Sequence, residues 1–198
     1  MKAQYENYLK AVWAAEEWDR QATVGEIASV LGLAPSSVSE AVRKLATEGL
    51  VEHAPYGAVT LTTSGRIAAA RVVRKHRLIE TFLVGYLGYS WDEVHDEAEI
   101  LEHAVSDEFV ARLAERLGHP ERDPHGDPIP NVDGSMLRET GIPLAEIGGD
   151  ELVRIVRVSD AVPGLLEALR RDGIGIGTEL RADAIEGVGR AGILIERL

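Results

Sequence analysis

The chain has 198 residues, enough for one or two domains with a buried core. It contains no cysteine, which excludes disulfides, thiolate metal sites and cysteine nucleophiles. No run reaches the roughly 18 apolar residues that a membrane-spanning helix needs, and the N-terminal stretch lacks the apolar core of a signal peptide. We therefore expect a soluble cytoplasmic protein with no membrane partner.

Charge is distributed unevenly along the chain. Residues 1–75 carry nine Lys and Arg against eight Asp and Glu, a net charge of +1, whereas residues 76–198 carry 12 against 25, a net charge of −13. Because nucleic acid repels an acidic surface, a DNA contact is expected only in the N-terminal third.

Three helices are predicted before residue 50. Residues 4–17 repeat apolar side chains at helical spacing. Thr23 and Glu26 predict a capping box at the start of a second helix, which ends at Gly32. A third helix is predicted over residues 36–48, before a glycine that favours a helix end. Its predicted buried face consists of Val38, Val42 and Leu45.

A β-hairpin is predicted after these helices. Residues 50–54 and 58–62 are short runs of alternating apolar residues, separated by a turn around Tyr56 and Gly57. Two helices joined at a glycine and followed by a hairpin are typical of a winged helix-turn-helix. The outward face of the third helix carries hydroxyl and basic side chains that suit base edges and phosphates, although a solvated helix face is the alternative. The candidate DNA-binding residues are Ser36, Ser37, Ser39, Arg43 and Lys44.

The rest of the chain predicts helices and then a small β-rich domain. Long helices are predicted over residues 64–87 and 91–117, and four prolines and a glycine predict a linker over residues 119–130. We interpret His119 and His125 in this linker as turn residues rather than ligands. Beyond it, strands are predicted over 151–159, 178–186 and 191–198, with a helix over 163–173.

Metal-competent side chains share one face of each long helix. The first helix has a His and a Glu four residues apart, and the second has His, Glu, Glu and His at 0, +4, +7 and +8, within an arc of roughly 100°. Any one of them has an ordinary structural explanation, but six aligned residues favour metal binding. They are His76, Glu80, His95, Glu99, Glu102 and His103.

Distance favours two separate metal sites. His95 and His103 are about 12 Å apart at ~1.5 Å rise per residue, which is too far for one ion. We expect one site at Glu99, Glu102 and His103, with Asn7 or backbone carbonyls of the N-terminal helix completing it. The second site would consist of His76, Glu80 and His95. Imidazole and carboxylate ligands without sulfur fit Mn²⁺ or Fe²⁺, and Zn²⁺ is also compatible.

The chain resembles the diphtheria-toxin-repressor family over about residues 3–130. The resemblance is carried by YLKAVW, APSSVSEAVRKL, YGAVTLT, RKHRLIETFLV and above all WDEVHDEAEILEHAVSD, and within the family it is nearest to the manganese-responsive regulators. It implies a mainly α fold: a winged helix-turn-helix over 1–73, a helical metal-binding and dimerisation domain over 74–130, and an SH3-like domain over 131–198 that is shortened after Glu186.

The resemblance also implies roles for the candidate ligands. Glu99, Glu102 and His103 match the primary, regulatory site, and Glu99 stands where the iron-responsive branch has a cysteine. Asn7 occupies the place of an aspartate in manganese members and brings no charge. The ancillary-site matches are His76, Glu80 and His95.

The C-terminal part departs from the family pattern. The carboxylate and the amide that complete the ancillary site in the iron branch fall near Val162 and Leu165, which cannot ligate, and Asp160 is a candidate substitute.

The resemblance implies a metal-dependent repressor of metal-uptake genes that binds a palindromic operator as a homodimer. The apolar positions expected to form the dimer interface are Ile100, Leu101, Ala104 and Val105. An iron- or zinc-responsive regulator of the same family is one alternative, and a winged-helix regulator with a purely structural metal cluster is a second. A two-metal hydrolase is an alternative of another class, but the sequence offers no nucleophile elbow, phosphate loop or HExxH motif.

Overall fold

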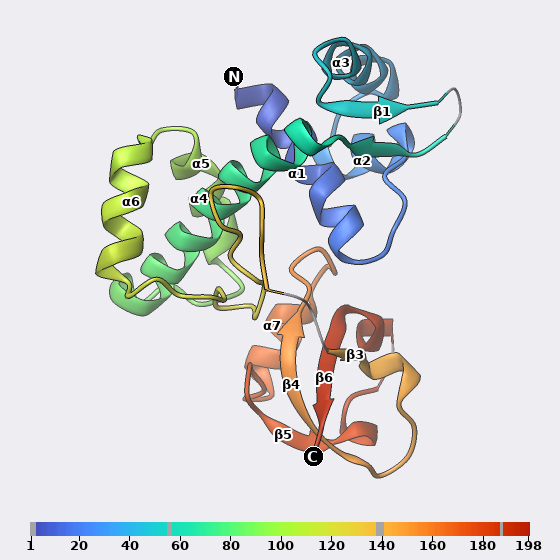
Figure 1. Cartoon of the computed structure of the whole chain (residues 1–198). Helices are drawn as coiled ribbons and strands as arrows, with labels where there is room; N and C mark the ends of the chain where they lie inside the picture. Colours follow the sequence, from blue (N-terminus) through green and yellow to red (C-terminus); the bar gives the residue numbers. More distant parts are fainter. Residues whose placement is uncertain (1–2, 55–56, 138–140, 187) are drawn as a thin grey trace. The chain divides into compact units, whose positions relative to one another are not determined.

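The computed structural model describes residues 3–54, 57–137, 141–186 and 188–198 (Figure 1). These form two compact units. The first comprises the described residues of Met1–Lys75 and Pro130–Met136, and the second those of His76–Ile129 and Leu137–Leu198. Within the described ranges, no helix is long and apolar enough to cross a membrane.

The first unit is a winged helix-turn-helix. It holds three helices, a two-stranded antiparallel hairpin and the first half of a long helix. The elements are α1 (Ala3–Glu17), α2 (Val24–Leu31), α3 (Pro35–Thr47), β1 (Val51–His53), β2 (Val59–Leu61) and the start of α4 (Thr63–Leu87).

The predicted helix boundaries of this unit are confirmed by local hydrogen bonds. The Thr23 hydroxyl accepts the N–H of Glu26 at 3.2 Å, and the Glu26 carboxylate accepts the N–H of Thr23 at 2.8 Å, which completes the capping box. Gly32 ends α2 in the left-handed conformation, with φ +63°. The predicted face of α3 is buried in a core shared with α1, which includes Val38, Val42, Leu45, Leu9 and Trp13.

The hairpin is tied to the helices on both sides. The N–H of Val59 donates to the carbonyl of Ala22 at 2.7 Å, just before α2. Gly65 in the first turn of α4 lies against the carbonyl of Leu50, where any Cβ would come within 1.8 Å of the oxygen, so only glycine fits. The predicted hairpin is therefore present; Tyr56, placed at its tip by the sequence, lies outside the described residues.

The helical part of the second unit differs from the prediction at one point. Residues 91–117 do not form one helix: α5 spans Val94–Glu102, and α6 spans Asp107–Arg116. His103 caps the end of α5, and the Ser106 hydroxyl accepts the N–H of Phe109 at 3.1 Å. Because serine satisfies a free N–H at a helix start, it favours a new helix there, and the predicted continuous helix is wrong.

The proline-containing segment 119–130 is irregular, as predicted, but it is a packed loop and not a linker. His125 is only 1% exposed, and its carbonyl accepts the N–H of Val158 at 2.9 Å. Gly126 has φ +84°, and a Cβ there would lie 2.1 Å from the carbonyl of Val156. This close approach fixes the loop against the sheet of the second unit. We call residues 121–129 the 121–129 loop below.

A small antiparallel sheet completes the second unit. The strand order is β3-β6-β4-β5, and the three predicted strands and the predicted helix are all present. The fourth strand, β3, has two residues, too few for an alternating pattern to reveal. The elements are β3 (Ile142–Pro143), β4 (Leu152–Val158), α7 (Leu165–Arg171), β5 (Glu179–Arg181) and β6 (Ile193–Arg197), with 3₁₀ turns at Leu144–Glu146, Ala182–Ala184 and Val188–Gly192.

Candidate functional site

Helix α3 presents the candidate DNA-binding residues to solvent. Ser36, Ser37, Arg43 and Lys44 are exposed, whereas Ser39 is half-buried. Lys44 lies 2.9 Å from the carboxylate of Glu40, one turn earlier on the same helix. This ion pair is exposed, so water screens it and both groups remain available to a partner.

A first group of metal-competent side chains joins α4 to α5. The Nδ1 atom of His76 lies 2.7 Å from Oε2 of Glu102, and ligand atoms of His76, Glu99 and Glu102 lie within 4.8 Å of one another. Glu102 is 2% exposed. We call these three residues the α5 cluster. His103 is adjacent, with its Nε2 atom 3.4 Å from Oε1 of Glu102.

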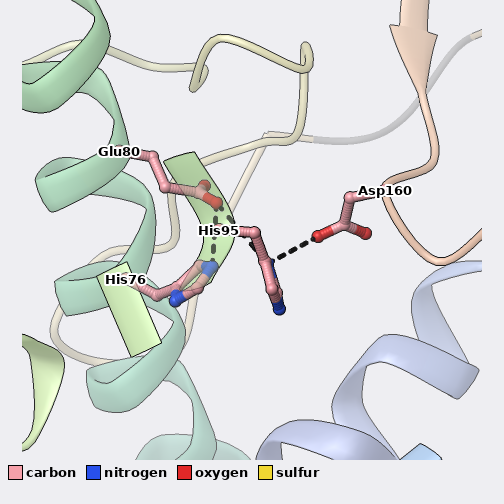
Figure 2. Close-up of side chains that lie close together, drawn as sticks. All are labelled: His76, Glu80, His95 and Asp160. Carbon is pink, nitrogen blue, oxygen red and sulfur yellow. Dashed lines mark ion pairs between the residues drawn. The ribbon is translucent and has the colours of Figure 1, made fainter. Parts of the chain in front are cut away.

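A second group extends from the other side of the same imidazole (Figure 2). Nε2 of His76 lies 2.9 Å from Oε1 of Glu80, and Nδ1 of His95 lies 3.7 Å from that same oxygen. Nδ1 of His95 also lies 3.2 Å from Oδ2 of Asp160, which follows β4. We call these four residues the Asp160 cluster. Asp160 is thus placed with the predicted ancillary residues, while Leu165 is buried in the core of the sheet and Val162 packs against that core.

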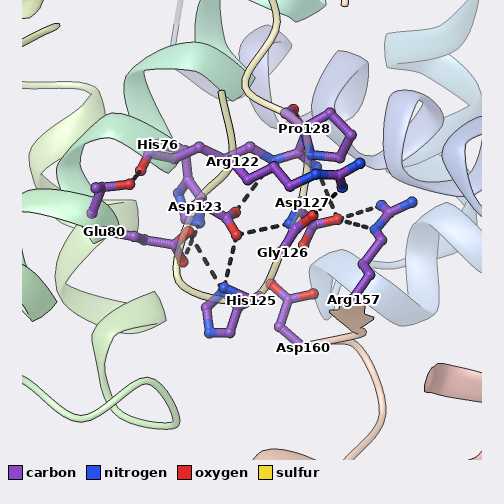
Figure 3. Close-up of polar contacts among 12 residues, drawn as sticks. His76, Glu80, Arg122, Asp123, His125, Gly126, Asp127, Pro128, Arg157 and Asp160 are labelled. Atoms are coloured by element: carbon purple, nitrogen blue, oxygen red, sulfur yellow. Dashed lines mark hydrogen bonds and ion pairs between the residues drawn. The ribbon is translucent and has the colours of Figure 1, made fainter. Parts of the chain in front are cut away.

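A third group was not predicted from the sequence. Asp123 and His125 of the 121–129 loop lie with Glu80 of α4, and their potential ligand atoms fall within 4.8 Å of one another (Figure 3). All three residues are buried. We call them the loop cluster. His125 lies in a turn, as predicted, in which the N–H of Gly126 donates to the carbonyl of Asp123 at 3.1 Å, but its ring is buried and faces a carboxylate. His119, in contrast, is exposed and has φ +54°.

The orientation of His125 suits a ligand. Its Nε2 atom lies 2.6 Å from the carbonyl of Trp91, and the two rings stack at 6.0 Å. A carbonyl only accepts hydrogen bonds, so Nε2 carries the proton and Nδ1 holds a lone pair in the neutral ring. Nδ1 is the nitrogen that faces Glu80, at 3.8 Å.

The charges of these groups perturb one another. Burial raises the pKa of Glu80, but the neighbouring His76, His95 and His125 together outweigh it, and the pKa lies well below its ordinary value. Ion pairs with Asp160 and Glu80 raise the pKa of His95 to about 10. Burial, together with repulsion from Asp127 and Glu80, raises the pKa of Asp123. Buried carboxylates that face imidazoles are costly unless they are compensated, which is typical of a functional site.

The donor set fits a hard or borderline divalent cation. The three clusters offer only imidazole nitrogen and carboxylate oxygen, which are ligands of Mn²⁺, Fe²⁺ and Zn²⁺. Asn7 lies on α1 in the first unit. Its Oδ1 atom is buried and accepts no hydrogen bond from any residue that the structure describes, as expected of an oxygen reserved for another partner.

Two family models match the chain almost end to end over its first two thirds. One is described as "Iron dependent repressor, N-terminal DNA binding domain" and matches residues 1–59. The other, "Iron dependent repressor, metal binding and dimerisation domain", matches residues 62–131. The second range contains the α5 cluster and the loop cluster in full.

Relatives of known function extend the match to the C-terminal part. The diphtheria toxin repressor of Corynebacterium glutamicum is 33% identical over 195 residues, covering 93% of this chain and 85% of its own length. The iron-dependent repressor IdeR of Mycobacterium leprae is 35% identical over 158 residues, covering 80% of this chain and 67% of its own.

Solved structures show the same fold. A manganese-dependent transcriptional repressor in complex with manganese has a TM-score of 0.89 and 42% identity, covering 98% of this chain and 100% of its own. The manganese regulator SloR has a TM-score of 0.81 and 37% identity, covering 98% of each chain. These proteins are transcriptional regulators and not enzymes, which rejects the hydrolase alternative. The chain therefore belongs to the diphtheria toxin repressor family of metal-dependent, DNA-binding transcriptional repressors.

Proposed function

We propose that this repressor responds to Mn²⁺ and, as a cytoplasmic homodimer, binds a palindromic operator of metal-uptake genes. The observation that carries the proposal is the α5 cluster, in which Glu102 is almost fully buried against His76. Glu99 supplies a second carboxylate and no cysteine thiolate is available, which favours Mn²⁺ over softer ions. Structural relatives named as a manganese-dependent transcriptional repressor and as a manganese regulator support the same ion.

The regulatory step follows from the charges of the α5 cluster. A bound divalent cation supplies the positive charge that two neighbouring carboxylates need in order to stay close. Three of the ligands that we assign to this cation lie toward the C-terminal end of α5, namely Glu99, Glu102 and His103. We assign the remaining ligand to Asn7 on α1. Because Asn7 belongs to the winged helix-turn-helix, its engagement fixes that unit, so that two α3 helices of a dimer can match successive major grooves about 34 Å apart.

The other two clusters are assigned to a second ion. Glu80 belongs to both of them, so it is the central ligand. His76 and His95 approach one of its oxygens, and His95 also faces Asp160, whereas His125 approaches the other oxygen of Glu80. We propose that Asp123 and His125 extend the ancillary ligand set predicted from the sequence, and that this site stabilises the second unit.

The DNA contact is assigned to the first unit. Ser36, Ser37 and Ser39 lie at the start of α3, where short hydroxyl side chains let a helix approach base edges, and Arg43 and Lys44 suit guanine or phosphate. We assign DNA binding to residues 1–73, metal binding and dimerisation to 74–130, and the SH3-like domain to 131–198.

The variant Glu102→Ala tests the proposal. Fluorescence anisotropy of a labelled palindromic operator is measured against Mn²⁺, Fe²⁺ and Zn²⁺ in turn, with wild type and variant. Mn²⁺ is expected to raise the operator affinity of the wild type by roughly 5–150-fold, the usual range of allosteric coupling. Glu102→Ala is expected to lose this stimulation and to remain a dimer by light scattering.

Asp96→Ala is the matched control, since Asp96 is an exposed carboxylate on the same helix. It is expected to respond to Mn²⁺ like the wild type. Wild-type stimulation in Glu102→Ala would refute the site assignment, and operator binding that needs no metal at all would favour a purely structural metal cluster. A response to Fe²⁺ or Zn²⁺ but not to Mn²⁺ would overturn the choice of ion alone.

A further inference from the structure

Four charged side chains of alternating sign form a buried row that begins at Asp123 of the loop cluster. Nε of Arg77 on α4 lies 3.6 Å from Oδ2 of Asp123, and its Nη2 atom lies 3.5 Å from Oδ1 of Asp127. Arg157 on β4 contacts the same Oδ1 atom with Nε at 2.5 Å and also with Nη2. All four residues are less than 10% exposed, so water screens their charges weakly.

Asp123 faces two competing demands. Its Oδ1 atom accepts the N–H of His125 at 2.8 Å and the N–H of Asp127 at 2.9 Å, and these two hydrogen bonds shape the 121–129 loop. Its Oδ2 atom faces the guanidinium of Arg77. A cation in the loop cluster therefore competes with Arg77 for the negative charge of Asp123, and the outcome depends on what else Arg77 contacts.

Asp127 supplies the other negative charge for Arg77. Its Oδ1 atom lies between the two guanidinium groups, and Arg77 is held on the same side by a 2.6 Å hydrogen bond from Nη1 to the carbonyl of Pro128. If Asp127 lost its charge, Asp123 would be the one charged carboxylate left in this row, beside the buried guanidinium groups of Arg77 and Arg157. Arg77 would then pair fully with Asp123.

We propose that Asp127 is a positioning residue that holds Arg77 away from full pairing with Asp123 and so keeps Asp123 able to ligate a divalent cation. The inference rests on the proposed function in one respect, namely that the loop cluster contributes to a second cation site. It gives the buried pair of Asp127 and Arg157 a role beyond holding the loop against β4.

Calorimetric titration of the metal-free, full-length protein with Mn²⁺ tests this. All titrations use a Glu102→Gln background, in which the α5 cluster is disabled and the second ion is measured alone. Asp127→Asn is expected to weaken its binding at least tenfold. Unchanged binding in Asp127→Asn would overturn the inference, and absence of binding in the Glu102→Gln parent would overturn the second site itself.

A double variant separates competition from a loss of structure. In Asp127→Asn/Arg77→Met the competing guanidinium is gone, so affinity is expected to return to within about threefold of the parent. If Asp127 only held the loop in place, the double variant would bind no better than Asp127→Asn, and that result would overturn the inference. Thermal unfolding of each variant shows that the proteins are folded. The midpoint temperature of unfolding is expected to be lower in both variants than in the parent. A recovery of Mn²⁺ affinity in the double variant therefore cannot come from recovered stability.

Discussion

The two halves of α4 bury very different side chains. In the first half, Ala69, Ala70 and Val73 are at most 4% exposed and belong to the core of the winged helix-turn-helix. In the second half, His76 is 6% and Glu80 is 1% exposed, although both are ionisable. The helix is continuous, so its backbone does not account for this difference.

The comparison separates what stabilises the fold from what performs its function. Burial of apolar side chains is favourable at about 25 cal/mol per Å² and needs no further explanation. Burial of His76 and Glu80 costs free energy that pairing only partly returns. A segment that keeps such residues indicates another benefit, which here is the capacity to hold a cation.

The largest expected effect comes from an apolar residue in the second half of α4. Leu78 is fully buried between the ionisable positions. Leu78→Ala is expected to lower the free energy of unfolding by about 2–5 kcal/mol, because it leaves a cavity. Urea unfolding measures this loss. At urea concentrations too low to unfold the variant, Mn²⁺ is expected to bind it as it binds wild type. A lost metal response in the folded variant would show that the role in stability and the role in metal binding cannot be separated.

A somewhat smaller effect is expected from metal itself. At a free Mn²⁺ concentration about 100 times Kd, a single site raises the free energy of unfolding by about 2.7 kcal/mol. His76 lies in both the α5 cluster and the Asp160 cluster, so His76→Gln is expected to lose most of this stabilisation. Chemical unfolding with Mn²⁺ and with a chelator gives the difference.

Arg71→Gln is the control for that experiment, because Arg71 is exposed in the first half of the same helix. It is expected to keep the full metal-dependent gain. A gain that survives in His76→Gln would place the cation elsewhere than on this imidazole.

The fold was largely predictable because its signals are local. The capping box at Thr23, the glycine at position 32 and the apolar spacing on α3 each act within one helix. The break between α5 and α6 was missed since the apolar spacing continues across it, while the decisive feature is the single N-cap at Ser106. The two-residue strand β3 has no pattern of its own and exists only through pairing with β6.

The site was predictable only where helical periodicity aligns ligands. His76 and Glu80, or Glu99 and Glu102, lie on shared faces that a 3.6-residue repeat reveals. Asp123 and His125 lie in an irregular loop whose path is set by distant contacts, such as the hydrogen bond from Val158. The D-P-H-G-D run gave one signal, since it places a His and two carboxylates around a glycine within five residues.

The smallest effect concerns pH in the metal-free protein. His95 faces Asp160 and Glu80, with Glu99 at 3.7 Å and the ring of His76 at 4.9 Å. Its pKa is raised from 6.5 to about 10, so the stability that its charge contributes is complete below pH 6.5 and is lost as pH rises toward 10. Burial raises the pKa of Asp160, but His95 outweighs it and lowers that pKa from 3.8 to about 2, so the contribution of Asp160 is lost as pH falls from 3.8 toward 2.

Urea unfolding of wild type and His95→Gln, both with chelator, checks this. The difference in their free energies of unfolding is expected to be largest between about pH 4 and 6.5 and to decline toward pH 10. The effect is modest because 42% of the His95 side chain is exposed and water screens its charge. A difference that stays constant from pH 6 to 10 would mean that His95 is neutral throughout. In that case Glu80 in the second half of α4 would be tolerated without an imidazolium at His95, and the contrast between the two halves of the helix would depend on His76 and not on His95.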